Sequence, residues 1–249
     1  MGGEGVDVLY GGSDGLNLDR ASWRTEKQDL YFDFTSSFTT RGNLTSDAIT
    51  EDLIYEVEGW EGSRSNFNTF DATDATEIFN FFGGDGGNLI IGGNGGDGAG
   101  AGLGDGLIGF QGNDTIIGNE GGDIIWGRRG DDYLDAGLNL SRTDTDGDAD
   151  QFNFERLSGN DVIVNFEVGL DFVVMRENDV DDQDGIAGIT ADDLIFSTVN
   201  AGGDAAVDDT KLVFETTGTG ANPQVFRSEI IFYDVDQSDL KDNGVFLFF

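Results

Sequence analysis

The sequence predicts an all-β fold in which the chain winds into stacked coils, and three observations lead to that prediction. A glycine- and aspartate-rich motif recurs about every nine residues from Gly83 to Asp135, and a short fixed period is the signature of coiled repeat architectures. Each copy carries a large apolar residue at a constant offset from its aspartate, as a short strand that buries one side chain requires. Helix signals are weak throughout, so strands and turns must supply most of the structure.

Six consecutive copies follow the template G-G-x-G-x-D-x-U-x, in which U is a large apolar residue. They are GGDGGNLII, GGNGGDGA, GAGLGDGLI, GFQGNDTII, GNEGGDIIW and GRRGDDYLD. The sixth slot holds Asn88, Asp97, Asp105, Asp114, Asp123 and Asp132, and the U slot holds Ile90, Ala99, Leu107, Ile116, Ile125 and Leu134. The second copy is one residue short and the third has Leu103 in its fourth slot, so irregular turns are expected there.

A further copy lies at the start of the chain. Residues 2–10 fit every slot and place Asp7 in the sixth, and residues 11–19 form a degraded copy with Leu16 where an aspartate belongs. The chain thus begins inside a repeat, which indicates either an open coil end or a truncated sequence. A glycine-rich flexible linker is the alternative to a folded array, but a linker has no use for apolar residues at fixed offsets.

The template suits a calcium site built between turns. Glycine is needed where the backbone takes a positive φ and where carbonyl groups approach an ion closely. Calcium takes six to eight oxygens, which carbonyls and one carboxylate from each of two neighbouring turns can supply. Two copies make one coil, so we expect Asp105 to face Asp123 and Asp114 to face Asp132. Such pairs repel each other without a metal, which makes the fold depend on calcium.

The composition fits a folded acidic protein and excludes several kinds of function. The 249 residues include 49 acidic and 13 basic side chains, a net charge of −36, and 37% are hydrophobic, too many for a disordered acidic tail. No basic surface is visible, so nucleic acid is not an expected partner. Cysteine and histidine are absent, which excludes thiol nucleophiles, zinc knuckles and histidine-based catalysis. No window is apolar over the roughly 18 residues of a membrane span.

Four segments are expected along the chain: residues 1–19 as an N-terminal repeat coil, 20–82 as a β-rich insertion with glycine-poor coils, 83–135 as the nonapeptide roll, and 136–249 as a C-terminal capping region. QDLYFDFTSSFTT alternates as a strand does, and the glycine-poor coils are expected to be held by packing instead of metal. ITADDLIF, TKLVFETT and SEIIFYDV are predicted strands. The first of these is alternatively a helix capped by Thr190.

The side chains that flank U point outwards, and in copies one, three and five they are mostly apolar. These copies are expected to share one sheet, whose outer face would carry Leu89, Ile91, Ile108, Ile124 and Trp126. An apolar stripe of this kind is normally covered. Either residues 136–249 or the 20–50 insertion packs on it, or it is a subunit interface.

Two acidic loops after the array provide further candidate metal ligands. In the first, Asp144, Asp146, Asp148 and Asp150 alternate as calcium ligands do, and in the second, residues 178–185, aspartates are dense. Neither loop fits the EF-hand spacing with its terminal glutamate. Solvated acidic loops are the alternative interpretation.

These features resemble the RTX (repeats-in-toxin) family of bacterial secreted proteins, most clearly over residues 2–10 and 83–135. The stretch ADQFNFERLSGNDVIVNFEVGLD is similar to the segment that closes such arrays. The resemblance implies a right-handed parallel β-roll, calcium between turns, an uncleaved C-terminal export signal within 136–249 and type I secretion. Family members carry enzymes or toxins beside the array, whereas this sequence shows no catalytic constellation.

The sequence therefore favours a secreted, non-enzymatic calcium-binding protein that folds after export and has a structural role in an extracellular layer, matrix or filament. An open coil end that docks on the next molecule would propagate as a filament, so the expected partners are calcium, the protein itself or cell-surface components. An adhesin or ligand-binding module is the alternative, in which exposed aromatic side chains such as Trp23, Trp60 and Trp126 would bind sugars. A third hypothesis is a glycan-acting enzyme that uses only carboxylates.

Overall fold

The structure is a computed structural model that describes residues 8–10, 20–22, 30–33, 40–44, 52–55, 59–63, 67–76, 78–95, 104–138, 145–155, 157–176, 193–201, 209–217, 225–242 and 244–248. Asp7, Trp23, Asp97, Asp144 and Thr190 lie outside these ranges. Across the described ranges, no helix is both long enough and apolar enough to span a membrane.

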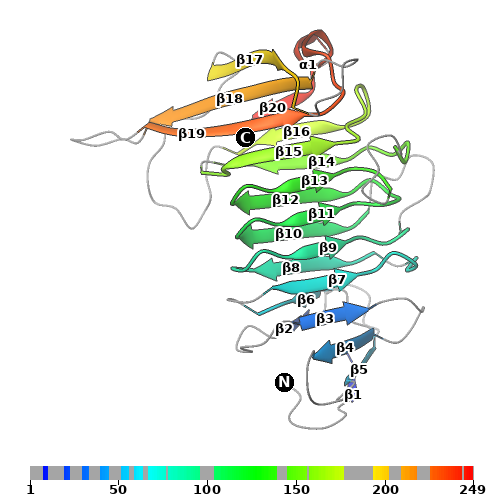
Figure 1. The fold of residues 1–249 in the computed structure, drawn as a ribbon. Helices are drawn as coiled ribbons and strands as arrows, with labels where there is room; N and C mark the ends of the chain where they lie inside the picture. Colours follow the sequence, from blue (N-terminus) through cyan, green and yellow to red (C-terminus); the bar gives the residue numbers. More distant parts are fainter. Residues whose placement is uncertain are drawn as a thin grey trace.

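The chain folds into two long β-sheets that face each other, with their strands stacked along one axis (Figure 1). Sheet A has twelve strands in the spatial order β1 (Val8–Tyr10), β5 (Asp52–Tyr55), β4 (Thr40–Leu44), β3 (Leu30–Asp33), β7 (Asn68–Asp71), β9 (Leu89–Ile91), β11 (Thr115–Ile117), β13 (Tyr133–Asp135), β15 (Asn160–Val164), β19 (Val225–Phe232), β18 (Asp209–Thr217) and β17 (Leu194–Val199). Sheet B has eight strands in the order β2 (Arg20–Ser22), β6 (Gly59–Glu61), β8 (Asn80–Gly84), β10 (Gly106–Gln111), β12 (Ile124–Arg129), β14 (Gln151–Phe154), β16 (Phe172–Met175) and β20 (Phe246–Phe248). From β6 to β16 the chain alternates between the sheets, so two successive strands make one coil of a parallel β-roll, as predicted.

The repeat sets the register of the roll. Leu107 pairs with Ile125 in sheet B and Ile116 pairs with Leu134 in sheet A, both in parallel strands. The apolar residue of each described copy points between the sheets and is fully buried, as Ile90, Leu107, Ile116, Ile125 and Leu134 show. Burying one such side chain stabilises the fold by about 1.5–3 kcal/mol, so this column of residues holds the two sheets together.

Aromatic side chains fill the core of the glycine-poor coils. The rings of Phe70 and Phe81 stack with centroids 5.1 Å apart, and those of Phe79 and Phe81 lie 5.3 Å apart. Trp60 is 1% exposed and pairs in register with Phe81, so the prediction that it is an exposed aromatic is wrong. It takes the inward position of β6, where the large indole area is removed from water. The predicted boundary between residues 82 and 83 falls within β8 of sheet B, and sheet A continues past it where β7 pairs with β9. The four-part division of the chain stays a prediction.

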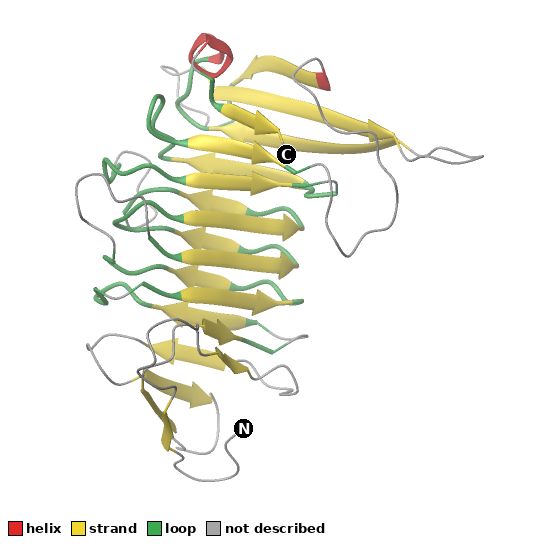
Figure 2. Ribbon diagram, turned by 180° about the vertical axis from the view of Figure 1, so that it is seen from behind, coloured by secondary structure: helices red, strands yellow, loops and turns green. Residues whose placement is uncertain are grey.

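The C-terminal residues close one end of the roll. β18 and β19 pair antiparallel with each other, as do β17 and β18, and the short helix α1 (Gln237–Asp242) lies beside them at the same end (Figure 2). The three predicted strands are confirmed, whereas the alternative helix is wrong over Leu194–Val199. That segment pairs along its whole length, and Phe196 packs edge to face on Phe246 with centroids 5.7 Å apart.

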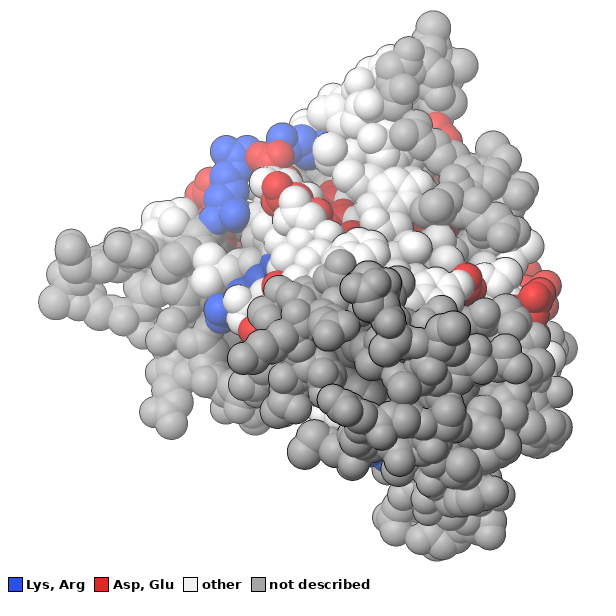
Figure 3. Space-filling model, turned by 60° about the horizontal axis from the view of Figure 1, so that its bottom comes forward, with Lys and Arg blue, Asp and Glu red and all other residues white. Residues whose placement is uncertain are grey.

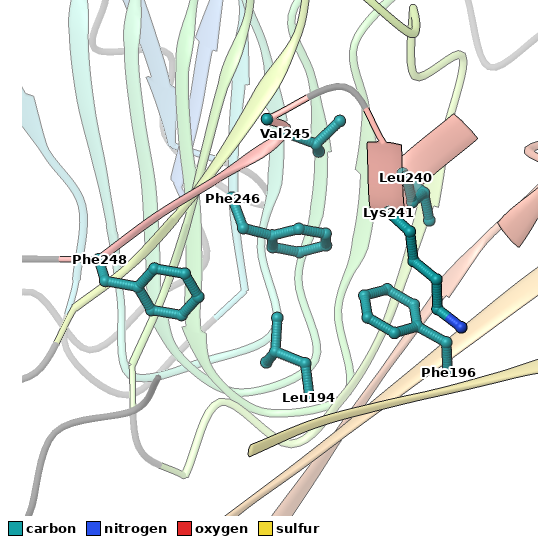
Figure 4. A pocket seen from close by; sticks show the side chains of 8 residues that line it. Leu194, Phe196, Leu240, Lys241, Val245, Phe246 and Phe248 are labelled. Carbon is teal, nitrogen blue, oxygen red and sulfur yellow. The ribbon is translucent and has the colours of Figure 1, made fainter. Parts of the chain in front are cut away.

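An apolar pocket of about 320 Å³ lies between β17, α1 and β20 (Figure 4). Its lining includes Leu194, Phe196 and Phe246, with Lys241 as the charged side chain among the lining residues. Lys241 Nζ lies 5.2 Å from the centroid of the Phe196 ring, so this cation is engaged in a cation–π contact. The lining includes no carboxylate side chain among the described residues, so the pocket is not a candidate calcium site.

The predicted apolar stripe is wrong in one respect, because its residues lie on two different sheets. Ile108, Ile124 and Trp126 lie on the outer face of sheet B, whereas Leu89 and Ile91 lie on β9 in sheet A. β9 pairs directly with β11, so the second copy places no strand between them. That copy is short and has only Ala99 in its U slot, and a small side chain gains little from burial in the core. Copies three and five therefore form β10 and β12 in sheet B, and not strands of sheet A beside the β9 strand of copy one.

Candidate calcium-binding ladders

The turns of the roll keep a left-handed backbone in two slots of the template. In the fourth slot φ is positive at Gly112, Gly121 and Gly130, at 117°, 108° and 147°. In the second slot it is also positive, at 84°, 69° and 74°, although that slot holds Phe110, Asn119 and Arg128. A left-handed non-glycine residue costs about 1–2 kcal/mol. The stacked array, and not glycine alone, therefore fixes the turn.

Glycine in the first slot makes room for the aspartate of the same copy. A Cβ added to Gly118 would lie 2.6 Å from Asp123 Oδ2. On Gly109 or Gly127 it would collide with Oδ2 of Asp114 or Asp132. Each of these carboxylates thus lies against the backbone of its own turn, and its Oδ2 faces backbone atoms instead of solvent.

Sixth-slot residues stack in two ladders, one along each edge of the roll. In the ladder beside sheet A, called ladder A, each backbone N–H donates to Oδ1 of the next residue at 3.1, 2.7, 2.8 and 2.9 Å. Its members are Asn68, Asn88, Asp114, Asp132 and Asp161. Ladder B lies beside sheet B, with corresponding distances of 2.6, 2.6, 2.7 and 2.9 Å. Its members are Phe79, Asp105, Asp123, Asp150 and Asp171.

The second carboxylate oxygen of most ladder aspartates lacks a hydrogen-bond donor among the described residues. Oδ2 is buried without such a donor at Asp114, Asp132 and Asp161 in ladder A and at Asp123 and Asp150 in ladder B. At the first and last aspartates of ladder B, Oδ2 of Asp105 accepts from Gly93 N–H and Oδ2 of Asp171 from Glu167 N–H, each at 2.7 Å. A buried polar atom without a partner costs about 1–3 kcal/mol, and more when charged. The five unpaired oxygens are therefore candidate ligands for a cation.

Burial raises the pKa of these carboxyl groups far above their ordinary value. It raises the pKa of Asp114 to about 8, of Asp132 to about 7 and of Asp161 to about 9. The pKa values of Asp123 and Asp150 also lie well above 3.8, first because of burial and then because of neighbouring aspartates. Bare charges are thus unstable in the ladders, which hold either protons or cations.

The residues of the ladders fit calcium. Calcium prefers oxygen ligands, which carboxylates and turn carbonyls provide. The carbonyl oxygen of Gly127 lies 2.9 Å from the position of a Cβ on Gly109, the same position that Asp114 Oδ2 approaches. Two acceptors therefore lie close to one point of the turn. No three acidic side chains group as a metal site among the residues that the structure describes, so carbonyl groups would have to complete the coordination. Bound calcium would neutralise the stacked carboxylates.

Asp146 of the first acidic loop joins the end of ladder B. Its Oδ1 accepts from Asp148 N–H at 3.1 Å, while its Oδ2 is buried and finds no donor in the described ranges. Burial raises the pKa of Asp146 to about 6, and the charges of Asp148 and Glu167 add to the effect. Glu167 Oε1 accepts from Gly147 N–H at 2.7 Å. The loop is therefore fastened beside Asp171, and Asp146 extends the set of candidate ligands.

Three ladder aspartates, Asp150, Asp161 and Asp171, lie beyond the regular array of the sequence, and of these Asp150 alone is among the predicted candidate ligands. They follow their predecessors in the ladders by 27, 29 and 21 residues, whereas Asp132 follows Asp114 by 18. A search at a fixed period therefore ends at Asp132. A weaker signal is present, because SGNDVIV and VGLDFVV keep the glycine, aspartate and apolar slots in the same order.

A parallel β-roll whose turns stack buried aspartates belongs to a class of folds with candidate cation sites between coils. A family model agrees with this class: the RTX calcium-binding nonapeptide repeat, in 4 copies, matches residues 1–15 and 108–139. The RTX resemblance is thereby confirmed over the matched residues, and the chain is a calcium-binding β-roll protein. No curated protein matches the chain.

Proposed function

We propose that this protein is a secreted, calcium-folded β-roll with a structural role in an extracellular layer, matrix or filament. The observation that carries the proposal is the pair of ladders, in which the unpaired carboxylate oxygens are buried. Extracellular calcium modules bind the metal at about 10⁻⁴ to 10⁻³ M. Before export the carboxylates repel each other and the coils that carry them stay unfolded. In extracellular calcium the turns close and the sheets form.

The net charge of the chain supports a fold that forms only when divalent cations bind. A net charge of −36 opposes compaction by self-repulsion. On the face seen in Figure 3, the Lys and Arg side chains gather on one side of the molecule, where acidic side chains accompany them. The basic side chains are too few to neutralise the acidic ones, so bound calcium is the natural counter-charge.

The ends of the two sheets support assembly of one molecule on the next. Among the described strands, β1 and β17 are the edges of sheet A, and β2 and β20 are the edges of sheet B. An edge strand presents unpaired backbone N–H and C=O groups to another chain. β17 also exposes Ile195, 58% of which is accessible. A contact between opposite ends of two molecules is heterologous and can continue as a filament.

Sedimentation and electron microscopy, with chelator and with millimolar calcium, test this proposal. In chelator we expect monomers whose aspartate coils, from Asp105 onwards, are unfolded, and in calcium we expect polymers. Ile195→Lys on edge strand β17 should abolish the polymers while leaving calcium-induced folding intact. Ile124→Lys is the matched control, because Ile124 is 46% exposed on an interior strand, and it should still polymerise. Folded monomers at high protein concentration in calcium would contradict the filament. Survival of the aspartate coils, from Asp105 onwards, in chelator would contradict calcium-dependent folding.

A second candidate function, binding of an acidic glycan, is favoured by one cluster on the outer face of sheet B. The guanidinium carbons of Arg128 and Arg176 lie 4.4 and 5.1 Å from the Trp126 ring. Arg176 Nε donates to Asn153 Oδ1 at 2.9 Å, which orients the amide. Trp126 Nε1 and Asn153 Nδ2 are buried donors without an acceptor among the described residues. Donors and positive charge together suit a sulfate or carboxylate group.

Titration calorimetry with a sulfated polysaccharide, in calcium, tests the second candidate. Arg176→Gln should weaken binding at least tenfold. Arg227→Gln is the control, because Arg227 is an exposed arginine on β19 whose side chain is 55% accessible, and it should bind as the wild type does. Equal loss in both variants would show a non-specific effect of charge. Absence of binding by the wild type would reject the candidate.

A further inference from the structure

The chemistry of the sixth slot changes at one point of the roll. On the N-terminal side the ladders hold the neutral residues Asn68, Phe79 and Asn88. From Asp105 onwards every described ladder residue is an aspartate. The N–H groups of Phe79 and Asn88 still donate to Oδ1 of the next ladder residue, so the coils stack across this point although the side chains differ.

The asparagine amides supply their own donors inside ladder A. Asn68 Nδ2 donates to Gly83 O at 2.9 Å and to Asn88 Oδ1 at 2.8 Å. Asn88 Nδ2 donates to Asp114 Oδ1 at 3.0 Å and reaches Gly109 O at 3.4 Å. Gly83 and Gly109 are first-slot residues of the following coils. Their carbonyl groups therefore receive an N–H from the preceding asparagine.

The amide nitrogen takes the place that the unpaired oxygen has in the aspartate turns. A Cβ on the first-slot residue Gly83 would lie 2.6 Å from Asn88 Nδ2, and a Cβ on Gly109 would collide with Asp114 Oδ2. In the asparagine turn an N–H faces the carbonyl group of the next coil. In the aspartate turn a carboxylate oxygen lies beside the equivalent carbonyl of Gly127, with no donor between them. The amide N–H thus supplies the positive partner that a bound cation would supply in an aspartate turn.

We infer that the coils described over residues 59–63, 67–76 and 78–95 close their turns by asparagine amides and aromatic packing, fold without calcium, and form a template on which the calcium-dependent coils from Asp105 onwards stack. This inference rests on the calcium-dependent folding proposed above. In ladder B the corresponding position belongs to Phe79, whose ring packs on Phe81 and needs no ion.

The architecture allows one part to be folded while the other is not. In a coiled repeat protein each coil contacts only its neighbours, so stability is close to a sum of local terms and folding spreads from a nucleus. Sheet A joins the two parts where β9 pairs with β11, and sheet B joins them where β8 pairs with β10. At these junctions β8 and β9 present complete strand edges to the first aspartate coils.

Hydrogen exchange of the full chain, read strand by strand in chelator and in calcium, tests the inference. Amides of β7 and β9 should be at least tenfold protected in both conditions, whereas those of β11, β13 and β15 should be protected only in calcium. Loss of protection at β7 and β9 in chelator would overturn the template. Protection of β13 in chelator would instead overturn calcium-dependent folding, so the two failures are distinguishable.

Two substitutions test the role of the amide directly. Asn88→Asp should make protection of β9 depend on calcium and should add one calcium ion to the number measured by calorimetry. Asn113→Asp adds the same charge at an exposed turn position and should change neither quantity. If Asn88→Asp fails to fold in calcium, Asn88→Ala decides: it should lower protection of β9 equally in chelator and in calcium. An unchanged calcium number for Asn88→Asp in folded protein, or unchanged protection in Asn88→Ala, would overturn the inference.

Discussion

Aspartate and asparagine differ by one group, yet in the ladders that group decides whether a turn needs a cation. Both side chains accept the backbone N–H of the preceding coil through Oδ1, as Asn88 and Asp114 do. The second atom is a donor in asparagine and an acceptor in aspartate. Because this atom is buried against turn carbonyls, the donor closes the turn alone and the acceptor does not.

Asp161 offers a direct test of this difference, because burial raises its pKa to about 9. Asp161→Asn should lower the calcium concentration needed for folding, since an orphan acceptor worth about 1–3 kcal/mol becomes a donor. In saturating calcium the variant should bind one ion fewer. A calcium titration followed by circular dichroism measures the first effect, and calorimetry measures the second. Asp85→Asn removes an equal charge from an exposed position, and an equal decrease in that variant would attribute the effect to net charge alone.

The ladder carboxyl groups also predict how metal-free stability depends on pH. Their folded pKa values of about 7 to 9 at Asp132, Asp114 and Asp161 exceed the ordinary 3.8, so the folded state binds more protons than the unfolded state between these values. Stability in chelator should therefore fall as pH rises from about 5 to 9. Calcium competes with the same protons, so calcium affinity should rise over this range. Circular dichroism during pH titration checks both trends, and metal-free protein that is more stable at pH 8 than at pH 5 would contradict them.

Turns depend on close contact between coils as well as on their own conformation. Gly112 has φ of 117°, and an added Cβ would lie 2.6 Å from the Gly86 carbonyl carbon. Gly169 precedes Asp171 with φ of 94°, but nothing lies within 4 Å of its Cβ position. Gly169→Ala should thus cost only the strain of a left-handed residue, about 1–2 kcal/mol. Gly112→Ala should cost about 2–5 kcal/mol, because overpacking adds to the strain. Denaturation in calcium compares them, and equal costs would show that contact between coils is unimportant.

The sequence predicts the elements that obey a local period and misses those that depend on contacts between coils. The burial of Ile116 and Leu134 and the stacking of Asp114 on Asp132 follow from the template. The template does not predict that β9 and β10 lie in different sheets. That arrangement arises because β9 pairs directly with β11, past the defective second copy. Asp161 lies in the segment that resembles the end of such arrays, but it is not among the predicted ligands. Longer loops break the period before it, while strand pairing still places it in ladder A.

The molecule as a whole is a single roll with two kinds of turn. Coils with buried Trp60, Phe70 and Phe81 depend on apolar area, whereas coils from Asp105 onwards depend on neutralised carboxylates. The C-terminal cap adds a third source of stability, since Phe232 and Phe246 pack edge to face at 6.4 Å. Bound calcium would therefore stabilise the aspartate coils that lie between the aromatic coils and the C-terminal cap. Removal of calcium should unfold these aspartate coils first.

The choice of cation separates binding in the ladders from general screening of charge. Sodium chloride at 1 M reduces the Debye length to about 3 Å and so weakens the repulsion that the net charge of −36 causes. It supplies no ligand to the buried Oδ2 atoms of Asp123 and Asp132. Magnesium demands octahedral geometry and keeps its waters, for which turns packed at hydrogen-bond distance leave no room. In circular dichroism of chelator-treated protein, calcium should restore the β-structure, while magnesium and sodium chloride should restore only a minor part. Full recovery in sodium chloride would mean that long-range repulsion, and not the buried oxygens, controls folding.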